Sequence, residues 1–536
     1  MGRWTALAEI DARLLAKVSK MIGSVGQQGL QSLGTTRKTY REEICQRLKP
    51  NPCSCKRSLF EVCLRGYMKN TTKHPDESGP QTVTSFIRTH NGKETIRIGF
   101  TQQRISPHAG LSAFASFLHW HRMKDLLGKV LPQRTSPNAT PSEDMALGFM
   151  TGIIAGAKKL TQVAHLRADP LLPQLLGIEA IGSQSAYSRY FQCFKSAPAN
   201  SQCFGRLWRW SLERLRARKD GYTLDVDSTQ LLHEDGHQKE GVATGHTVRG
   251  QKRAYHPLLG ILAEAKVVAG FWLRPGNTRC DTNVVGFLQE LLARLPQWLH
   301  LKLVRADSGF CYEPLLALLE SRRLPYIVVA RLYEPVRSLI RQTTQWQPTE
   351  IPGTEVAEAL HQEWGWSHPR RVVLLRHSRP DAGGRLLVEC PGYTYQALVT
   401  SLPPEVGALE VWRRYNGRAG SENVIRELDE CFALPQLSLK KFYATEAALS
   451  LAVLTYNLCT LFQSHVGWMD RVTTATLRFL VFTTGGVISR TGGYTTIRLA
   501  VQEQAHKQWW ARLLEKLACP FPNCNAVEKL QANLFA

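Results

Sequence analysis

The sequence lacks a hydrophobic run long enough to cross a bilayer. A membrane-spanning helix needs ~20 predominantly apolar residues. The longest apolar stretch, residues 447–462, is shorter and contains Thr455, Tyr456 and Asn457. We therefore expect a buried helix in a globular core and no membrane partner. Internal repeats and low-complexity segments are also lacking, which excludes a repeat architecture.

Paired cysteines are lacking as well. The chain has 13 cysteines, an odd number, without the two paired clusters of a structural zinc site. The nearest approach to such a cluster is Cys53, Cys55 and Cys63. Charged side chains interrupt the start of the chain at Arg3, Glu9, Asp11 and Arg13. Without a secretory signal, we expect a reduced cytoplasmic protein.

Acidic residues are outnumbered by basic ones. The chain has 44 Asp and Glu against 67 Lys and Arg, a formal charge of +23, and a pI of about 9.6. This balance favours a polyanionic partner such as nucleic acid, although a membrane surface or a ribosome would require the same sign. No glycine-rich phosphate loop is present, so we expect no nucleotide cofactor.

The chain is long and apolar enough for several domains. Its 536 residues, 43% of them hydrophobic, exceed one typical core. Texture and periodicity divide it into an N-terminal extension, a helical region, a first core segment, a β insertion, a second core segment and a basic helical tail. The predicted boundaries are 1–93, 94–220, 221–330, 331–402, 403–465 and 466–536.

The helical region has features of a DNA-binding module. Short helices joined by a glycine-containing turn, the last bearing Tyr187 and Arg189, favour a helix-turn-helix. Arg209 and Arg214 lie in a basic, aromatic helix that suits phosphates. Long arginine side chains also cover apolar surface without any ligand, so both interpretations stay open.

An acidic strand is the centre of the sequence. In residues 222–229 side chains alternate between faces, so Asp225 and Asp227 share one face while Leu224 and Val226 pack on the other. Two carboxylates at such a short distance repel each other unless a proton, a cation or substrate chemistry offsets the repulsion. The pair therefore indicates a functional site.

Two further acidic segments supply an explanation. Asp307 ends an apolar strand, and Glu422 lies in a later helix, 307 − 227 = 80 and 422 − 307 = 115 residues along the chain. Three carboxylates from separate elements are what hard divalent cations require. Tyr415 and Arg418 precede Glu422 at helical spacing, so all three side chains would lie on the same face of the helix.

The order of elements predicts an α/β fold. Three strands, a helix, a strand, a helix and a strand between residues 221 and 330, with acids at strand ends, describe a ribonuclease-H-like core. A β insertion would separate this core from the third carboxylate, with helical DNA-binding segments before and after. Ligands of such open sheets lie at the carboxyl ends of strands.

At this point the motifs resemble those of a known family. Four segments stand in order: Asp225-Val-Asp-Ser-Thr229, Arg274-Pro-Gly-Asn277, Arg305-Ala-Asp-Ser-Gly-Phe310 and Tyr415-Asn-Gly-Arg-Ala-Gly-Ser-Glu422-Asn. Together they are similar to the DDE transposases of bacterial insertion sequences, of the transposase DDE domain group 1 type with a tyrosine-arginine-glutamate signature. The resemblance covers roughly residues 95–514.

The resemblance implies roles for individual residues. Asp227, Asp307 and Glu422 would be the catalytic, metal-binding triad, holding two Mg²⁺ ions that Mn²⁺ can replace. Supporting residues would be Asp225, Tyr415 and Arg418. From the helical region and the four motifs together, the residues expected to bind DNA are Tyr187, Arg189, Arg209, Arg214, Arg274, Asn277 and Arg418.

The resemblance also implies the reaction and its partners. The enzyme would cut at the terminal inverted repeats of its element and join the freed 3′ ends to target DNA. It would work as a homodimer in a synaptic complex, near the nucleoid of a bacterial cytoplasm.

One position departs from the family pattern, which expects a lysine seven residues after the glutamate. That position is Asp429, and Lys440 or Lys441 could take its place. The departure keeps open an inactive, DNA-binding relic. A second alternative is a haloacid-dehalogenase-type phosphatase, in which Asp225 would attack phosphate and Asp227 would act as acid or base.

Overall fold

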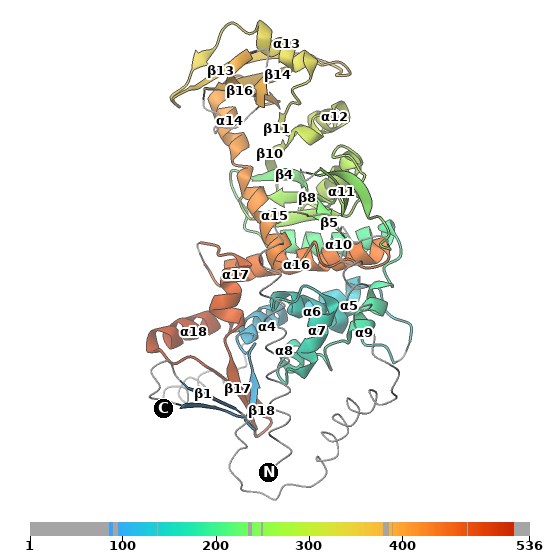
Figure 1. Ribbon diagram of the computed structural model, residues 1–536, viewed down its shortest axis with the longest axis vertical. Helices are drawn as coiled ribbons and strands as arrows, with labels where there is room; N and C mark the ends of the chain where they lie inside the picture. Colours follow the sequence, from blue (N-terminus) through green and yellow to red (C-terminus); the bar gives the residue numbers. More distant parts are fainter. Residues whose placement is uncertain are drawn as a thin grey trace, which may run out of the picture. The chain divides into compact units, whose positions relative to one another are not determined.

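The computed structural model describes residues 85–88, 95–136, 138–233, 238–247, 250–378, 385–387, 390–468 and 470–518 (Figure 1). The chain forms two compact units, residues 1–101 and 102–536. In the first unit, strands β1 (Ser85–Arg88) and β2 (Thr95–Ile98) pair antiparallel. Most of the predicted N-terminal extension, with Cys53, Cys55 and Cys63, lies outside the described residues.

A mixed sheet runs through the second unit. Its core half has the order β9-β8-β4-β10-β11. The bounds are β4 (Tyr222–Ser228), β8 (Leu258–Leu262), β9 (Val267–Trp272), β10 (Leu301–Ala306) and β11 (Tyr326–Val329). β10 pairs parallel with β4 and β11, whereas β8 pairs antiparallel with β4 and β9. This α/β arrangement has the strands and helices in the order that the sequence predicts.

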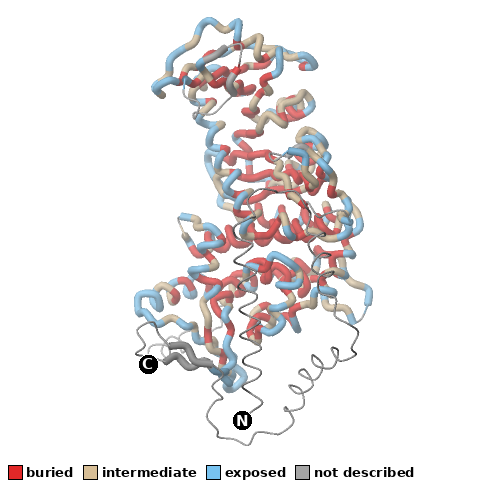
Figure 2. Tube along the Cα trace, viewed as in Figure 1, coloured by how far each residue is buried: buried red, intermediate tan, exposed pale blue. Residues whose placement is uncertain are grey.

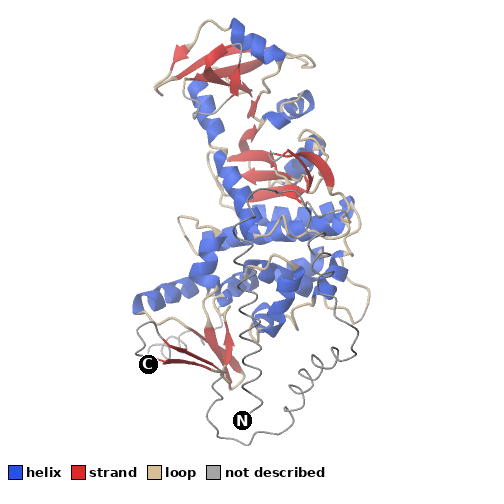
Figure 3. Ribbon diagram, in the orientation of Figure 1, coloured by secondary structure: helices blue, strands red, loops and turns tan. Residues whose placement is uncertain are grey.

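Helices cover both faces of this core sheet (Figure 3). Alternate side chains of β8 show how: Leu258 and Leu262 join one apolar cluster with α11 (Val284–Arg294) and α12 (Glu313–Ser321). Leu259 and Ile261 join the other, which includes the helices that precede the sheet. The strands are therefore buried on both faces (Figure 2), which explains their nearly continuous apolar sequences.

The segment predicted as a β insertion continues the same sheet. Beyond β11 the order is β16-β14-β13-β12, all antiparallel, and β15 pairs with β16. The bounds are α13 (Glu334–Gln342), β12 (Gln347–Pro348), β13 (Thr354–His361), β14 (Arg370–His377), β15 (Arg385–Leu387) and β16 (Cys390–Thr400). β16 runs antiparallel to β11, with Thr400 opposite Ile327, so the chain leaves the sheet at the edge opposite to the one where Asp307 follows β10.

A helical bundle precedes the sheet. Its helices are α4 (Leu111–Trp120), α5 (Met123–Val130), α6 (Ser142–Ile154), α7 (Leu160–His165), α8 (Leu172–Leu176), α9 (Gln184–Phe191) and α10 (Ala197–Leu212). Gly148 of α6 faces Tyr187 of α9, and a Cβ there would lie 2.6 Å from the Tyr187 hydroxyl oxygen. The small residues of α6 thus make room for an aromatic core.

Helix α16 (Phe442–His465) contains the apolar stretch that the sequence singles out. Its length and composition would allow a membrane span, but its most apolar window is wholly buried inside the protein. Asn457 accepts a hydrogen bond from the Val268 backbone N–H (2.9 Å) and donates one to the Val268 carbonyl (2.8 Å). The polar residues of α16 therefore satisfy the edge strand β9, and the predicted buried helix is confirmed.

The C-terminal region differs from the all-helical tail that the sequence predicts. Between α17 (Thr474–Leu477) and α18 (Gln504–Leu517), strands β17 (Gly486–Thr491) and β18 (Tyr494–Leu499) form a hairpin that also pairs with β3 (Arg104–Ser106). The turn uses Gly492 and Gly493, both with positive φ, as tight hairpin turns require. This Gly-Gly turn is the signal that the helical prediction overlooked.

The charged loop predicted after β4 also contains strands. β5 (Leu231–Leu232), β6 (Ala243–Thr247) and β7 (Gly250–Tyr255) form a small antiparallel sheet. This sheet leads the chain from the acidic end of β4 back to β8.

Candidate active site

Asp225 is committed to a buried ion pair. Asp225 is fully buried, and Arg305 lies directly opposite it on β10. Arg305 donates from Nε to Oδ1 (2.6 Å) and from Nη2 to Oδ2 (2.8 Å). Burial raises the pKa of Asp225, and Arg305 opposes that rise. With both oxygens bonded to one guanidinium, this carboxylate is not available as a nucleophile.

Asp227 lies two residues further along, where β4 approaches its end. Arg418 donates from Nη2 to its Oδ2 (2.6 Å), and the Ser228 backbone N–H donates to its Oδ1 (2.8 Å). Burial raises the pKa of Asp227 to about 6, Arg418 opposes the rise, and the charge of Asp307 adds to it. The two aspartates of one strand therefore have different surroundings.

Asp307 follows β10 directly and caps a short 3-10 helix (Ser308–Phe310) by accepting the Gly309 backbone N–H (2.8 Å). Arg331, which follows β11, donates to the carbonyls of Ser308 and Gly309 (2.8 and 3.2 Å). The parallel pairing of β4 and β10 places Asp307 beside the end of β4. The sheet thus brings together two aspartates that are 80 residues apart.

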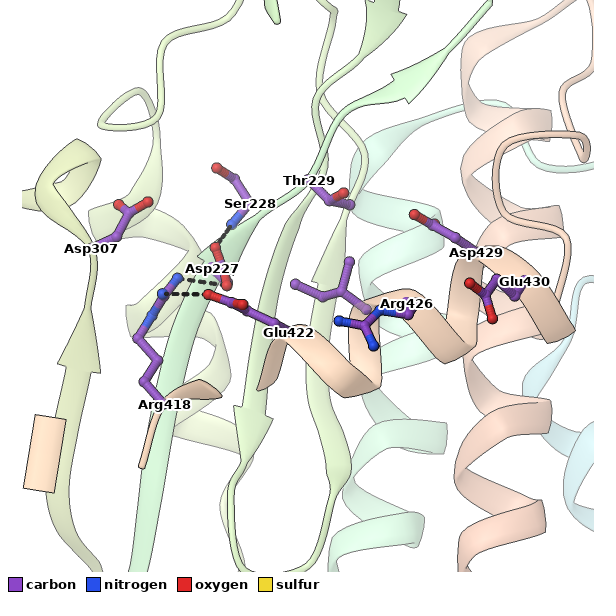
Figure 4. Close-up of a pocket in the computed structure, with 10 residues that line it drawn as sticks. Asp227, Ser228, Thr229, Asp307, Arg418, Glu422, Arg426, Asp429 and Glu430 are labelled. Carbon is purple, nitrogen blue, oxygen red and sulfur yellow. Dashed lines mark hydrogen bonds and ion pairs between the residues drawn. The ribbon is translucent and has the colours of Figure 1, made fainter. Parts of the chain in front are cut away.

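The third carboxylate comes from a broken helix. α14 (Ala408–Asn416) ends just before Arg418, and α15 (Ala419–Cys431) carries Glu422. Arg418 lies at the junction, 2.6 Å from Asp227 and 3.8 Å from Glu422 Oε1 (Figure 4). The Glu422 side chain is 62% exposed. Burial raises the pKa of Tyr415, whose charge partners include Arg418, Asp307 and Asp227.

These groups share one pocket of about 440 Å³. Its lining comprises Asp227, Ser228, Thr229, Asp307, Arg418, Glu422, Ile425, Arg426, Asp429 and Glu430 (Figure 4). The structure brings together the three acids that the sequence predicts. Lys440 and Lys441 are not among the lining residues, and Lys441 faces Glu240 at 4.0 Å.

Asp429, at the position of the expected lysine, also lines this pocket. Its Oδ1 is buried without a hydrogen-bond partner. Burial, and then the charge of Glu430, raise the pKa of Asp429 to about 7. The pocket therefore has five carboxylates and two guanidiniums among its lining residues.

The carboxylates fit a hard divalent cation in the kind of donor they offer, because Mg²⁺ takes oxygen ligands. Within the described residues, no three acidic, histidine or cysteine side chains are grouped closely enough to hold an ion. Arg418 lies between two of these acids, since its guanidinium bonds Asp227 and is 3.8 Å from Glu422 Oε1. A cation would compete with Arg418 for the Asp227 oxygen.

Two predicted DNA contacts are corrected by burial. Tyr187 is 0% exposed, and its ring packs against Phe149 in the helical core. Arg274 is 3% exposed and, within the described residues, donates to the backbone carbonyls of His256, Arg279, Cys280 and Thr282. Both side chains stabilise the fold. The predicted helix-turn-helix thus lacks an exposed tyrosine.

The other predicted DNA contacts lie nearer the surface. Arg189 and Asn277 are exposed. The Arg209 side chain is 52% exposed and pairs with Glu213. Arg214 is half-buried, stacks on Trp210 with its guanidinium carbon 3.7 Å from the ring centroid, and donates to His121.

Sequence reasoning missed several residues that build this site. Arg305 holds Asp225, Arg426 lines the pocket, and His256 bonds the Ser228 hydroxyl (Nε2–Oγ 3.0 Å). A signal existed for Arg305, because it stands two residues before Asp307, which is the spacing of side chains on one face of an extended segment. No local signal marks His256, which depends on the fold to meet Ser228.

Residues 88–519 match the family described as transposase DDE domain group 1. No curated protein matches the sequence. Among solved structures, the chain is similar to that of the piggyBac transposase synaptic complex with hairpin DNA, determined by cryo-EM. That match has 11% identity, a TM-score of 0.39, and covers 80% of this chain and 87% of the other.

The family match spans most of the sequence and includes every residue of the acidic pocket. This chain therefore belongs to the transposase DDE domain group 1 family, the DDE transposases.

Proposed function

We propose that this protein performs cut-and-paste DNA transposition. It would bind the terminal inverted repeats of a mobile element, cleave the DNA strands there and join the freed 3′ ends to target DNA. The observation that carries the proposal is the meeting of Asp227, Asp307 and Glu422 at one pocket, together with Arg418. A ribonuclease-H-like core accounts for this meeting, because acids at neighbouring strand ends share one edge of the sheet.

Each acid has a distinct position in the proposed chemistry. Asp227 lies in β4 and Asp307 directly follows β10, and a backbone N–H holds each carboxylate, whereas the Glu422 side chain is 62% exposed on α15 and would turn toward them. These three side chains would hold Mg²⁺ or Mn²⁺. When bound, two divalent cations supply activation of the attacking oxygen and charge stabilisation of the leaving oxygen in phosphoryl transfer.

Arg418 would act as a placeholder cation. It neutralises Asp227 while the carboxylates stand without a cation, which limits their mutual repulsion. Once displaced from Asp227, its planar guanidinium can bind a DNA phosphate through two hydrogen bonds. Tyr415, whose pKa responds to the charges of Arg418, Asp307 and Asp227, would share that phosphate.

Arg426 would bind DNA without any such exchange. It is exposed, it lines the pocket, and within the described part of the chain it has no hydrogen-bond or ion-pair partner. A free guanidinium beside five carboxylates gives the DNA backbone a point of attachment. We therefore assign to Arg426, rather than to Lys440 or Lys441, the place of the lysine that the family pattern expects at position 429.

The phosphatase alternative finds no support in the geometry. A nucleophilic aspartate needs a free oxygen near the substrate, and both Asp225 oxygens are bonded to Arg305 away from solvent. The inactive relic remains the rival, since Asp429 adds negative charge to the pocket.

The test is cleavage of a labelled duplex that carries the flanking inverted repeat, with Mg²⁺ or with EDTA. We expect metal-dependent release of a 3′ end by the wild type. Asp227→Ala, Asp307→Ala and Glu422→Ala should each abolish cleavage yet still shift the duplex in a gel. Tight binding without cleavage by the wild type would establish the relic, and cleavage in EDTA would exclude the metal-dependent mechanism.

A further inference from the structure

A clamped loop lies behind the two aspartates. Residues 274–282 follow β9, and their path is fixed by Arg274, which is 3% exposed. Its Nε donates to the His256 carbonyl (2.9 Å), and its Nη1 to the carbonyls of Arg279, Cys280 and Thr282 (3.0, 3.1 and 2.8 Å). Gly276 sits so tightly that a Cβ would lie 1.9 Å from the Ala254 carbonyl oxygen. The loop therefore behaves as a rigid support.

His256 connects this loop to the acidic strand. Its Nδ1 lies 2.7 Å from the Thr278 carbonyl oxygen. A carbonyl can only accept, so Nδ1 carries the proton and Nε2 is left with a lone pair. That lone pair accepts the hydroxyl proton of Ser228 (3.0 Å). Burial lowers the pKa of His256, which keeps the ring neutral and this tautomer in place.

Ser228 passes the constraint to Asp227. Its backbone N–H donates to Asp227 Oδ1 at 2.8 Å. Neighbouring side chains of a strand point to opposite faces. His256 fixes the Ser228 hydroxyl on one face of the strand. The Ser228 backbone N–H is thereby fixed as well, and it orients the Asp227 carboxylate on the opposite face.

The same loop also supports the second aspartate. A Cβ on Gly309 would meet Cys280 at 2.8 Å (Cβ) and 3.0 Å (Sγ), so the Cys280 side chain packs directly on the turn that Asp307 caps. Cys280 Sγ also lies 3.7 Å from the Ser228 hydroxyl. One loop thus touches both strand ends, β4 through His256 and β10 through Cys280.

We propose that His256 is a positioning residue, which transmits the rigidity of the Arg274-clamped loop through Ser228 to Asp227 and so sets the affinity of the carboxylates for a divalent cation. The inference rests on the proposed function, because it assumes that Asp227 and Asp307 bind the cation. Residues that orient metal ligands in this way commonly change metal affinity by about 10- to 100-fold when replaced.

The test measures Mn²⁺ binding to the full-length protein by electron paramagnetic resonance, without DNA. In His256→Asn the amide nitrogen can replace Nδ1 toward Thr278, but nothing reaches Ser228. In His256→Gln the longer side chain can place an acceptor near Nε2. We expect His256→Asn to weaken Mn²⁺ binding by about tenfold and His256→Gln to retain most of the affinity.

The opposite order would overturn the inference. If His256→Asn binds Mn²⁺ better than His256→Gln, the histidine serves only to anchor the loop at Thr278. Ser228→Ala should weaken binding as His256→Asn does, and the two changes together should cost no more than one alone. Additive losses would contradict a shared path.

A buried histidine elsewhere supplies the matched control. His377 is 1% exposed, bonds Thr354 through Nδ1 (3.1 Å), and lies in β14 outside the pocket. His377→Asn should leave Mn²⁺ affinity unchanged, and circular dichroism confirms the folding of each variant. If wild type and Asp307→Ala bind Mn²⁺ equally, the proposed function itself fails. If Asp307→Ala alone loses binding, only the role of His256 is refuted.

Discussion

At the scale of single residues, two aspartates on one face of one strand have separate tasks. Asp225 faces Arg305 across the β4–β10 pair and is fully buried. Asp227 lies nearer the strand end, where Arg418 reaches it from the α14–α15 junction. The cross-strand neighbour decides which carboxylate is structural and which one faces the pocket.

Asp225→Ala should therefore destabilise the fold rather than only the chemistry. Removing one partner of a buried ion pair leaves the other charge uncompensated and costs about 3–5 kcal/mol of unfolding free energy. In Asp225→Ala the uncompensated charge is that of Arg305. Urea unfolding followed by circular dichroism measures the loss. The double variant Asp225→Leu with Arg305→Met should recover part of it, because no charge is then left buried.

Glu422→Ala is the control for that prediction. Its side chain is 62% exposed, so we expect a stability change within about 0.5 kcal/mol although cleavage is lost. Equal unfolding free energies for Asp225→Ala and Glu422→Ala would show that the Asp225–Arg305 pair does not hold the sheet.

At the scale of elements, helix α16 covers the outer edge of strand β9. Besides Asn457, Glu446 takes part: it accepts hydrogen bonds from the Asn200 amide (2.8 Å) and from the Leu273 backbone N–H (3.3 Å). These contacts satisfy backbone groups that an edge strand leaves unpaired. They also place a carboxyl group in an apolar interior.

Glu446 should make stability depend on pH. Burial raises its pKa from the ordinary 4.5 to about 7. The folded protein therefore binds this proton more tightly than the unfolded chain does. The associated stability is complete below about pH 4.5 and is lost as pH rises through about 7. Relative to Glu446→Gln, the wild type should lose about 2–3 kcal/mol of unfolding free energy between about pH 5 and about pH 8.

Denaturant unfolding of both proteins across that range is the measurement. The exposed Glu422→Gln provides the baseline, because it should follow the wild type throughout. Parallel curves for the wild type and Glu446→Gln would mean that the carboxyl group stays ionised in the folded protein.

At the scale of the whole molecule, the net charge of the chain is opposite in sign to the charge of the acidic pocket. The chain carries a formal +23, whereas five carboxylates line the pocket beside two arginines. In the proposed function the overall charge would attract DNA, and the pocket would repel its phosphates until cations are present. Binding and cleavage should consequently depend on different groups.

Salt dependence separates these contributions. The logarithm of the DNA association constant should fall linearly with the logarithm of salt concentration, with a slope of about −0.9 for each phosphate contact. We expect Arg426→Gln to reduce the slope by about one contact, as measured by fluorescence anisotropy. Arg413→Gln, which removes an exposed arginine paired with Glu350, should leave the slope unchanged. An unaltered slope in Arg426→Gln would remove Arg426 from the interface.

Those residues of the site that a local sequence pattern marks could be predicted from the sequence. The alternation around Asp227, the apolar strand before Asp307 and the spacing of Arg418 and Glu422 predicted three acids that the structure places at one pocket. The buried helix of residues 447–462 was predicted from its length and its polar residues, because an unpaired Asn457 would be costly in lipid.

Only the tertiary structure decided which of the remaining polar residues support the site. Arg274 and Tyr187 look like DNA contacts in sequence, but their exposure depends on packing against distant segments, as the carbonyl partners of Arg274 show. The link from His256 to Ser228 joins two strand ends that meet through sheet pairing. Periodicity reports which face of an element a residue occupies, whereas the partner across that face is set by long-range contacts.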